Sequence, residues 1–150
     1  MSKDDEAAYS PLKCRIRLDY RGEARSRFLF KGKNTERAAE EIREQKITLL
    51  RNVPVQGVVV EDIDAGMEVY TVYDEIMGGE TAFAPVLLTI KADSMQDIMR
   101  FIILEEFRKV EVLSPEEVVL DRHAVERFLF AANKEMQTLR GFLERKISAR

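Results

Sequence analysis

The chain has 150 residues, 45% of them apolar, which is enough for one hydrophobic core and not for several domains. A net charge of −3 and a pI near 5.4 argue against a protein whose whole surface binds nucleic acid, although a local basic patch could still do so. One cysteine allows no internal disulfide, no apolar run approaches the roughly 20 residues that cross a bilayer, and the N-terminus lacks a signal-peptide core. We therefore expect a cytoplasmic protein without membrane contact.

The chain begins with a predicted tail and a predicted hairpin. Residues 1–11 are polar and charged, as in a frayed terminus. Residues 12–20 alternate between apolar and charged side chains, which is the period of a half-buried strand. Residues 25–31 resume the alternation after a turn at residues 21–24, and we expect the two strands to pair.

A helix and a second hairpin are expected next. The polar run at residues 34–36 begins a helix that carries small and branched apolar side chains toward a core. Residues 47–53 are interpreted as an extended segment, which a proline ends. Residues 55–64 and 67–73 alternate on either side of the turn Asp64-Ala65-Gly66 and predict two strands joined as a hairpin.

Residues 84–120 form the stretch around which the other elements are arranged. The apolar run Val86–Ile90 predicts a strand, and Ser94 with Asp97 three positions later predicts the start of a helix. Residues 110–112 then restore strand alternation. This strand-helix-strand unit repeats the pattern of the N-terminal half.

Two such units joined through β structure predict an α+β fold. The specific expectation is a ferredoxin-like sandwich with an antiparallel sheet, extra N-terminal and central strands, and a long C-terminal helix. We expect one domain over residues 12–113. The helix over residues 114–150 either belongs to that domain or serves oligomerisation.

The last helix is predicted from Pro115 to about Ile147. Its start offers a cap hydroxyl, a proline at the first helical position and two carboxylates in the first turn. From Val125 onward, apolar residues recur at intervals of four, three, four, three and four, which is heptad spacing. These residues are Val125, Leu129, Ala132, Met136, Leu139 and Leu143. We predict that they form the interface of a homo-oligomer, a dimer in the simplest case, or else pack on the protein's own body.

Residues 84–120 also resemble a known family. The run Leu88-Thr-Ile-Lys-Ala-Asp-Ser-Met-Gln-Asp-Ile-Met-Arg-Phe-Ile-Ile and the return strand Lys109-Val-Glu-Val-Leu-Ser-Pro-Glu-Glu-Val118 resemble the WCX module. That module is the ferredoxin-like C-terminal extension of WYL-domain transcriptional regulators in bacteria. The winged helix-turn-helix and the WYL-type barrel of that family are missing from this sequence. The resemblance implies a regulatory ligand-sensing or oligomerisation role.

Charge is unevenly distributed along the chain. Residues 13–37 carry nine basic groups against three acidic ones, whereas residues 52–90 carry seven acidic groups and no basic one. Strands of opposite charge can lie side by side in one sheet, or basic and acidic surfaces can dock between subunits. The third interpretation is a nucleic acid or anionic ligand bound on the basic hairpin. The residues predicted for that site are Arg15, Arg17, Arg25, Arg27 and Lys31.

No residue pattern predicts a catalytic, metal or cofactor site. His123, the one histidine, has no partner of matching type and is interpreted as a helix-surface residue. Gly78-Gly79 lacks the lysine of a phosphate loop. The acidic residues around the central turn do not match a calcium-binding loop. They are Glu61, Asp62, Asp64 and Glu68.

An RNA-binding sheet is a further possibility, because Phe28 and Phe30 resemble the base-stacking aromatics of such folds. The strand at residues 86–90 carries no aromatic partner, which favours a packed sheet. The sequence therefore predicts a non-enzymatic bacterial protein that oligomerises or binds a regulatory ligand or protein partner. The alternative function is nucleic-acid or anionic-ligand binding.

Overall fold

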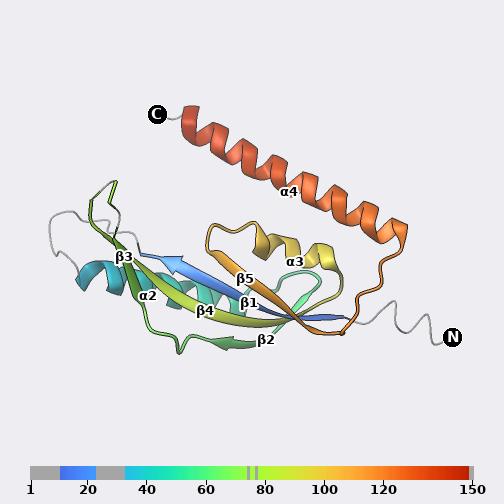
Figure 1. Cartoon of the computed structure of the whole chain (residues 1–150), viewed down its shortest axis with the longest axis horizontal. Helices are drawn as coiled ribbons and strands as arrows, with labels where there is room; N and C mark the ends of the chain where they lie inside the picture. Colours follow the sequence, from blue (N-terminus) through green and yellow to red (C-terminus); the bar gives the residue numbers. More distant parts are fainter. Residues whose placement is uncertain (1–10, 23–32, 74, 77, 149–150) are drawn as a thin grey trace.

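The computed structural model describes residues 11–22, 33–73, 75–76 and 78–148. These residues form an α+β fold with an open, five-stranded antiparallel sheet and three helices, as Figure 1 shows. The predicted α+β class and the long C-terminal helix are confirmed. Residues 1–10 of the predicted tail and the predicted strand at residues 25–31 lie outside the described residues.

Strand β1 (Leu12–Arg21) forms as predicted and occupies the interior of the sheet. It pairs antiparallel with β4 (Glu80–Ala92) on one side and with β5 (Phe107–Ser114) on the other. Alternate residues of β1 and β4 are fully buried on one face: Cys14, Ile16, Leu18, Val86, Leu88 and Ile90. Since residues opposite each other in a sheet point to the same side, the two strands supply one continuous apolar face.

Strands β2 (Val58–Asp64) and β3 (Tyr70–Tyr73) correct one prediction. The hairpin expected around residues 64–66 does not form, because both strands pair antiparallel with β4 and not with each other. At 13 residues, β4 is long enough to hold two short strands in succession along one edge. Alternation along a strand predicts its buried face, whereas it leaves the partner strand undetermined. The sheet order is therefore β2-β4-β1-β5, with β3 beside the first part of β4.

Pro85 lies within β4, where a proline is unusual because it has no N–H for the sheet. The N–H of Gly22 donates to the carbonyl of Ala82 at 2.9 Å, and hydrogen-bonded pairs alternate along antiparallel strands. By that alternation the nitrogen of Pro85 points away from β1, toward the edge between β2 and β3, where none of the described strands needs a donor. Its carbonyl accepts a hydrogen bond from Nη1 of Arg43 at 3.2 Å. The strand can therefore continue through the proline.

Helix α2 (Lys33–Asn52) is longer than predicted. The interpretation of residues 47–53 as extended is wrong, since the helix continues to Asn52. The side chains of Ile42, Ile47 and Leu50 pack on the apolar face of the sheet. This contact favours a helix over the extended form that branched side chains prefer in isolation.

Helix α3 (Met95–Ile102) begins at the predicted cap. The N–H of Ser94 donates to Oδ2 of Asp97 at 3.1 Å, and its hydroxyl donates to the same atom at 2.7 Å. Ile98 and Phe101 are buried in the core that also holds the apolar side chains of α2. Both helices therefore cover one face of the sheet, and none of the described helices packs on the opposite face, which we call the open face.

Helix α4 (Arg122–Ser148) begins later than the predicted start at Pro115. Residues 115–121 are not helical, and Oδ1 of Asp121 accepts a hydrogen bond from the N–H of Ala124 at 2.7 Å. Since the branched side chains at residues 118 and 119 disfavour a helix, the serine-proline signature does not begin one here. The helix then lies over α3 on the side remote from the sheet, as Figure 1 shows.

Candidate functional site

The predicted interface residues lie together on one side of a continuous helix. The side chains of Val125, Leu129, Met136, Leu139 and Leu143 are between 40% and 60% exposed, and Ala132 is half-buried. Residues spaced by three and four lie on the same side of a helix, so the six form a stripe about 27 Å long. We call this stripe the α4 seam. No residue of α4 is buried, which shows that the described body of the protein does not cover the seam.

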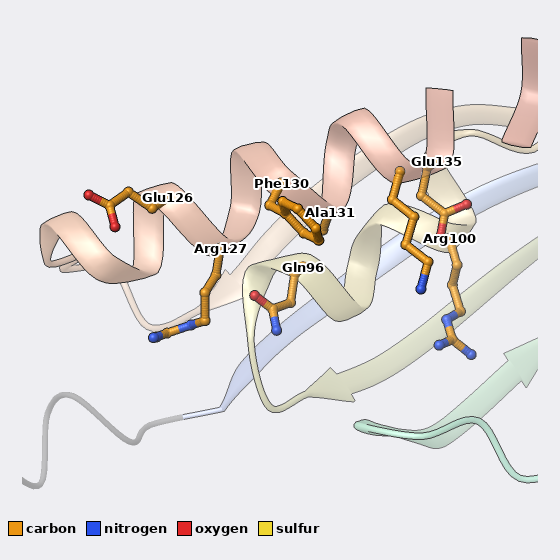
Figure 2. Close-up of a pocket in the computed structure, with 8 residues that line it drawn as sticks. Gln96, Arg100, Glu126, Arg127, Phe130, Ala131 and Glu135 are labelled. Carbon is orange, nitrogen blue, oxygen red and sulfur yellow. The ribbon is translucent and has the colours of Figure 1, made fainter. Parts of the chain in front are cut away.

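The contact between α3 and α4 uses another side of α4. Half-buried side chains recur along the first half of the helix at positions 124, 128, 131 and 135, which is a second helical stripe. Figure 2 shows Ala131 and Glu135 lining a groove together with residues of α3. The interaction with α3 therefore leaves the α4 seam exposed.

The groove between α3 and α4 has a volume of about 580 Å³ and carries charges of both signs. Arg100, Arg127 and Lys134 line it together with Glu126 and Glu135. In the heptad, Arg127 and Lys134 occupy positions opposite the α4 seam. The groove and the seam are consequently on different sides of the helix, and the mixed charge of the groove selects neither anions nor cations.

A second cluster lies on the open face of the sheet, around the carboxylate of Asp19. Only 2% of Asp19 is exposed. Its Oδ1 accepts a hydrogen bond from Nε of Arg17 at 2.9 Å, and Oδ2 accepts one from the hydroxyl of Tyr70 at 2.5 Å. Nε of Arg108 lies 3.7 Å from Oδ2. Strands β1, β3 and β5 thus each supply one ligand of this carboxylate.

Aromatic rings extend the cluster along β4. The rings of Tyr70 and Phe83 are stacked with centroids 5.4 Å apart, and the guanidinium of Arg108 lies 5.4 Å from the centroid of Phe83. Burial and the bond to Asp19 raise the pKa of the Tyr70 hydroxyl, and the same carboxylate raises the pKa of Arg17 through its hydrogen bond. Asp19 therefore orders two cations and a phenol on the open face.

Part of the basic N-terminal segment is neutralised within the sheet. Nζ of Lys13 and Nζ of Lys91 lie 3.3 Å and 3.1 Å from the carboxylate of Glu61 on β2. Hydrogen bonds from Lys91 and Lys13 lower the pKa of Glu61. The interpretation in which basic and acidic strands meet inside one sheet accounts for these side chains.

The structure places two of the five residues predicted for anion binding on the open face. Arg15 and Arg17 both lie on β1, Arg15 exposed and Arg17 held by Asp19. The other three, Arg25, Arg27 and Lys31, lie outside the described residues. No site predicted from the sequence included Tyr70, Phe83 or Arg108, which join this face from distant strands. Phe83 had a detectable signal, because it continues the alternation of β4 toward its N-terminal end.

The remaining chemistry candidates show no assembled site. His123 is exposed on α4, and its Nδ1 lies 3.6 Å from the carboxylate of Glu126. Within the described ranges, no group of three or more His, Cys, Asp or Glu side chains is arranged to hold a metal ion. A search of the same residues finds no helix with the length and apolarity needed to span a membrane.

Comparisons with protein-family models, with curated proteins and with solved structures found no match for this chain. The geometry of the two surfaces is therefore the basis for proposing a function.

Proposed function

We propose that this protein is a self-associating module that forms a homodimer through the α4 seam. The observation that carries the proposal is a 27-residue helix with no buried residue and a continuous stripe of half-exposed apolar side chains. Exposed apolar surface of this extent favours association, at roughly 25 cal/mol for each Å² removed from water. A helix with heptad spacing buries such a stripe most readily against another helix of the same kind.

The proposed body of the module is a ferredoxin-like sandwich. Its support is the element order strand-helix-strand-strand-helix-strand, once β2 and β3 are taken together as the second strand, and the sheet order β2-β4-β1-β5. The resemblance of residues 84–120 to the WCX module stays a prediction. It adds a regulatory role to the proposal, in which the dimer presents its bodies to a ligand or partner.

Light scattering after size exclusion tests the dimer on the full chain. At micromolar concentration we expect twice the chain mass of 17.3 kDa. Replacing Leu129 and Leu139 with glutamate should give a monomer. Burying these charged groups in the dimer interface would cost more free energy of hydration than the remaining apolar contacts contribute. The matched control replaces Gln137 and Thr138, exposed residues away from the seam, with glutamate and should stay dimeric. A monomeric parent chain would refute the proposal.

A second candidate function, binding of an anionic ligand or nucleic acid on the open face, is favoured by the cluster around Asp19. There two arginines face one carboxylate, which leaves a net positive charge, and the exposed side chains of Arg15 and Arg21 follow the same side of β1. A row of cations beside stacked aromatic rings suits a phosphate backbone with unstacked bases.

Fluorescence anisotropy with a labelled single-stranded oligonucleotide at low salt tests this second function. We expect binding that weakens steadily as salt rises and that weakens further when Arg15 and Arg21 are both changed to glutamine. The control changes Lys46 and Arg51 of α2 to glutamine, which removes the same charge from the other side of the sheet. Equal effects of the two double variants, or no binding by the parent, would exclude a site on the open face.

A further inference from the structure

The residues of the α4 seam and those beside it also indicate how two copies of α4 would be oriented in the dimer. In heptad terms, Val125, Ala132 and Leu139 occupy one inner position, and Leu129, Met136 and Leu143 occupy the other. Two copies of such a helix can pair in parallel or antiparallel orientation. The two arrangements differ in which flanking residues meet across the seam and in which seam residues face each other.

Charge at the flanks favours the antiparallel arrangement. Glu126 and Arg140 are both exposed and occupy the same flanking position at the two ends of the seam. Antiparallel pairing places Glu126 beside Arg140 of the partner subunit, and two-fold symmetry repeats the pair. Parallel pairing would instead require Glu135 to meet the partner's Arg140. Both glutamates border the groove. However, Glu135 is half-buried there, whereas the side chain of Glu126 is 71% exposed.

The sizes of the seam residues favour the same arrangement. Antiparallel pairing places the small Ala132 opposite the partner's Met136, so that a small residue faces a long one. Leu129 then faces Leu139 of the partner subunit, and Val125 faces the partner's Leu143. Parallel pairing would place Ala132 opposite the partner's Ala132 and leave a void in that layer, which destabilises a packed interface.

We propose that α4 pairs with α4 of a second copy in antiparallel orientation, centred near Lys134, with Leu129 against Leu139 of the partner subunit. This inference rests on the proposed self-association and adds the orientation and register of the pair. The dimer is isologous, since each seam supplies the same residues to both ends of the interface.

Cysteine cross-linking distinguishes the orientations. Leu129→Cys and Leu139→Cys are made singly in the full chain, where the native Cys14 is fully buried and does not react. An equimolar mixture of the two variants should form a disulfide-linked dimer under mild oxidation, whereas either variant alone should not. In the antiparallel pair, two copies of position 129 lie ten residues apart along the axis, about 15 Å, which exceeds the reach of a disulfide.

The possible results of cross-linking and light scattering distinguish a wrong orientation from an absence of association. Cross-linking of each single variant with itself would establish a parallel pair and overturn the inference while leaving the dimer in place. A light-scattering dimer that never cross-links would overturn the register. A monomer would overturn both proposals together.

Charge reversal gives an independent readout of the register. Glu126→Arg and Arg140→Glu should each raise the dissociation constant of the dimer roughly fivefold, since each breaks two symmetric surface ion pairs. The double variant should restore the parent value. The control Arg127→Glu, on the side of α4 opposite the seam, should leave the dissociation constant of the dimer unchanged, and an equal loss of dimer in this control would contradict the register.

Discussion

Asp19 points to the open face of β1, yet it is almost completely covered by its own ligands. Carboxylates with so little exposure are stable only when their oxygens are hydrogen-bonded and their charge is balanced, and Arg17, Tyr70 and Arg108 meet both requirements. These four residues come from three strands that are distant in sequence. No local spacing could therefore have predicted the cluster, although the alternation of β1 predicted which face holds Arg15 and Arg17.

Removing the charge of Asp19 should destabilise the protein. Asp19→Asn leaves two arginines without a counter-charge, and we expect the free energy of unfolding to fall by about 2 kcal/mol, less than for a fully buried pair because both arginines reach solvent. Urea denaturation measures the change. Asp62→Asn, an exposed residue on β2, serves as the control, and equal effects of the two variants would show that the cluster contributes nothing to stability.

Tyr20 gives a prediction about alkaline pH. The residue is 3% exposed, and burial raises the pKa of its hydroxyl to about 12. In an unfolded chain, tyrosine has a pKa near 10. Between pH 10 and 12 the unfolded state therefore loses a proton that the folded state retains. The free energy of unfolding consequently falls as the pH rises. Relative to Tyr20→Phe, the parent should lose roughly 2–3 kcal/mol over this range. Parallel stability curves for the two proteins in urea would contradict the burial argument.

At the scale of single elements, the caps and faces were predictable and the lengths were not. Ser94 and Asp97 begin α3 as their spacing indicates, and the seam residues of α4 share one side of a helix. The apolar run at residues 47–50 fits both strand and helix periods, and only its contact with the sheet selects the helix. The start of α4 was missed because Val118 and Val119 disfavour the helix that the serine-proline signature predicts, and the cap at Asp121 comes only after them.

Replacing two of the glycines with alanine should change the stability of the protein in opposite directions. At Gly22, where β1 ends, a Cβ would lie 2.3 Å from the carbonyl oxygen of Thr35 and 2.6 Å from the backbone nitrogen of Ala39. Gly22→Ala should therefore push β1 from α2 and lower the free energy of unfolding by roughly 1–3 kcal/mol. Gly141→Ala on α4 meets no atom and should stabilise the helix by about 1 kcal/mol. Thermal melts followed by circular dichroism measure both, and a harmless Gly22→Ala would contradict the close packing described.

At the scale of the whole molecule, the sheet with α2 and α3 holds the buried core, and α4 contributes none of it. A chain that ends at Glu117 should therefore keep its melting temperature within a few degrees of the parent at low protein concentration. As concentration rises, the melting temperature of the parent should increase while that of the shortened chain stays constant, because association stabilises only a folded state that can associate. A shortened chain that fails to fold would show that α4 belongs to the core.

The position of β1 in the sheet also governs how the chain acquires its structure. Leu12 faces Ala92, and Cys14 faces Val112, so both described partners of the first strand come from the second half of the chain. Pairings between such distant residues slow folding, because the chain loses entropy when the long loop between them closes, before any stabilising contact forms. Synthesis proceeds from the N-terminus. Strand β1 therefore has neither of its described partner strands, and its apolar face stays exposed, until residues 80–114 have left the ribosome. Of the described strands, the one that is made first can therefore enter the sheet only after both of its partners have been made.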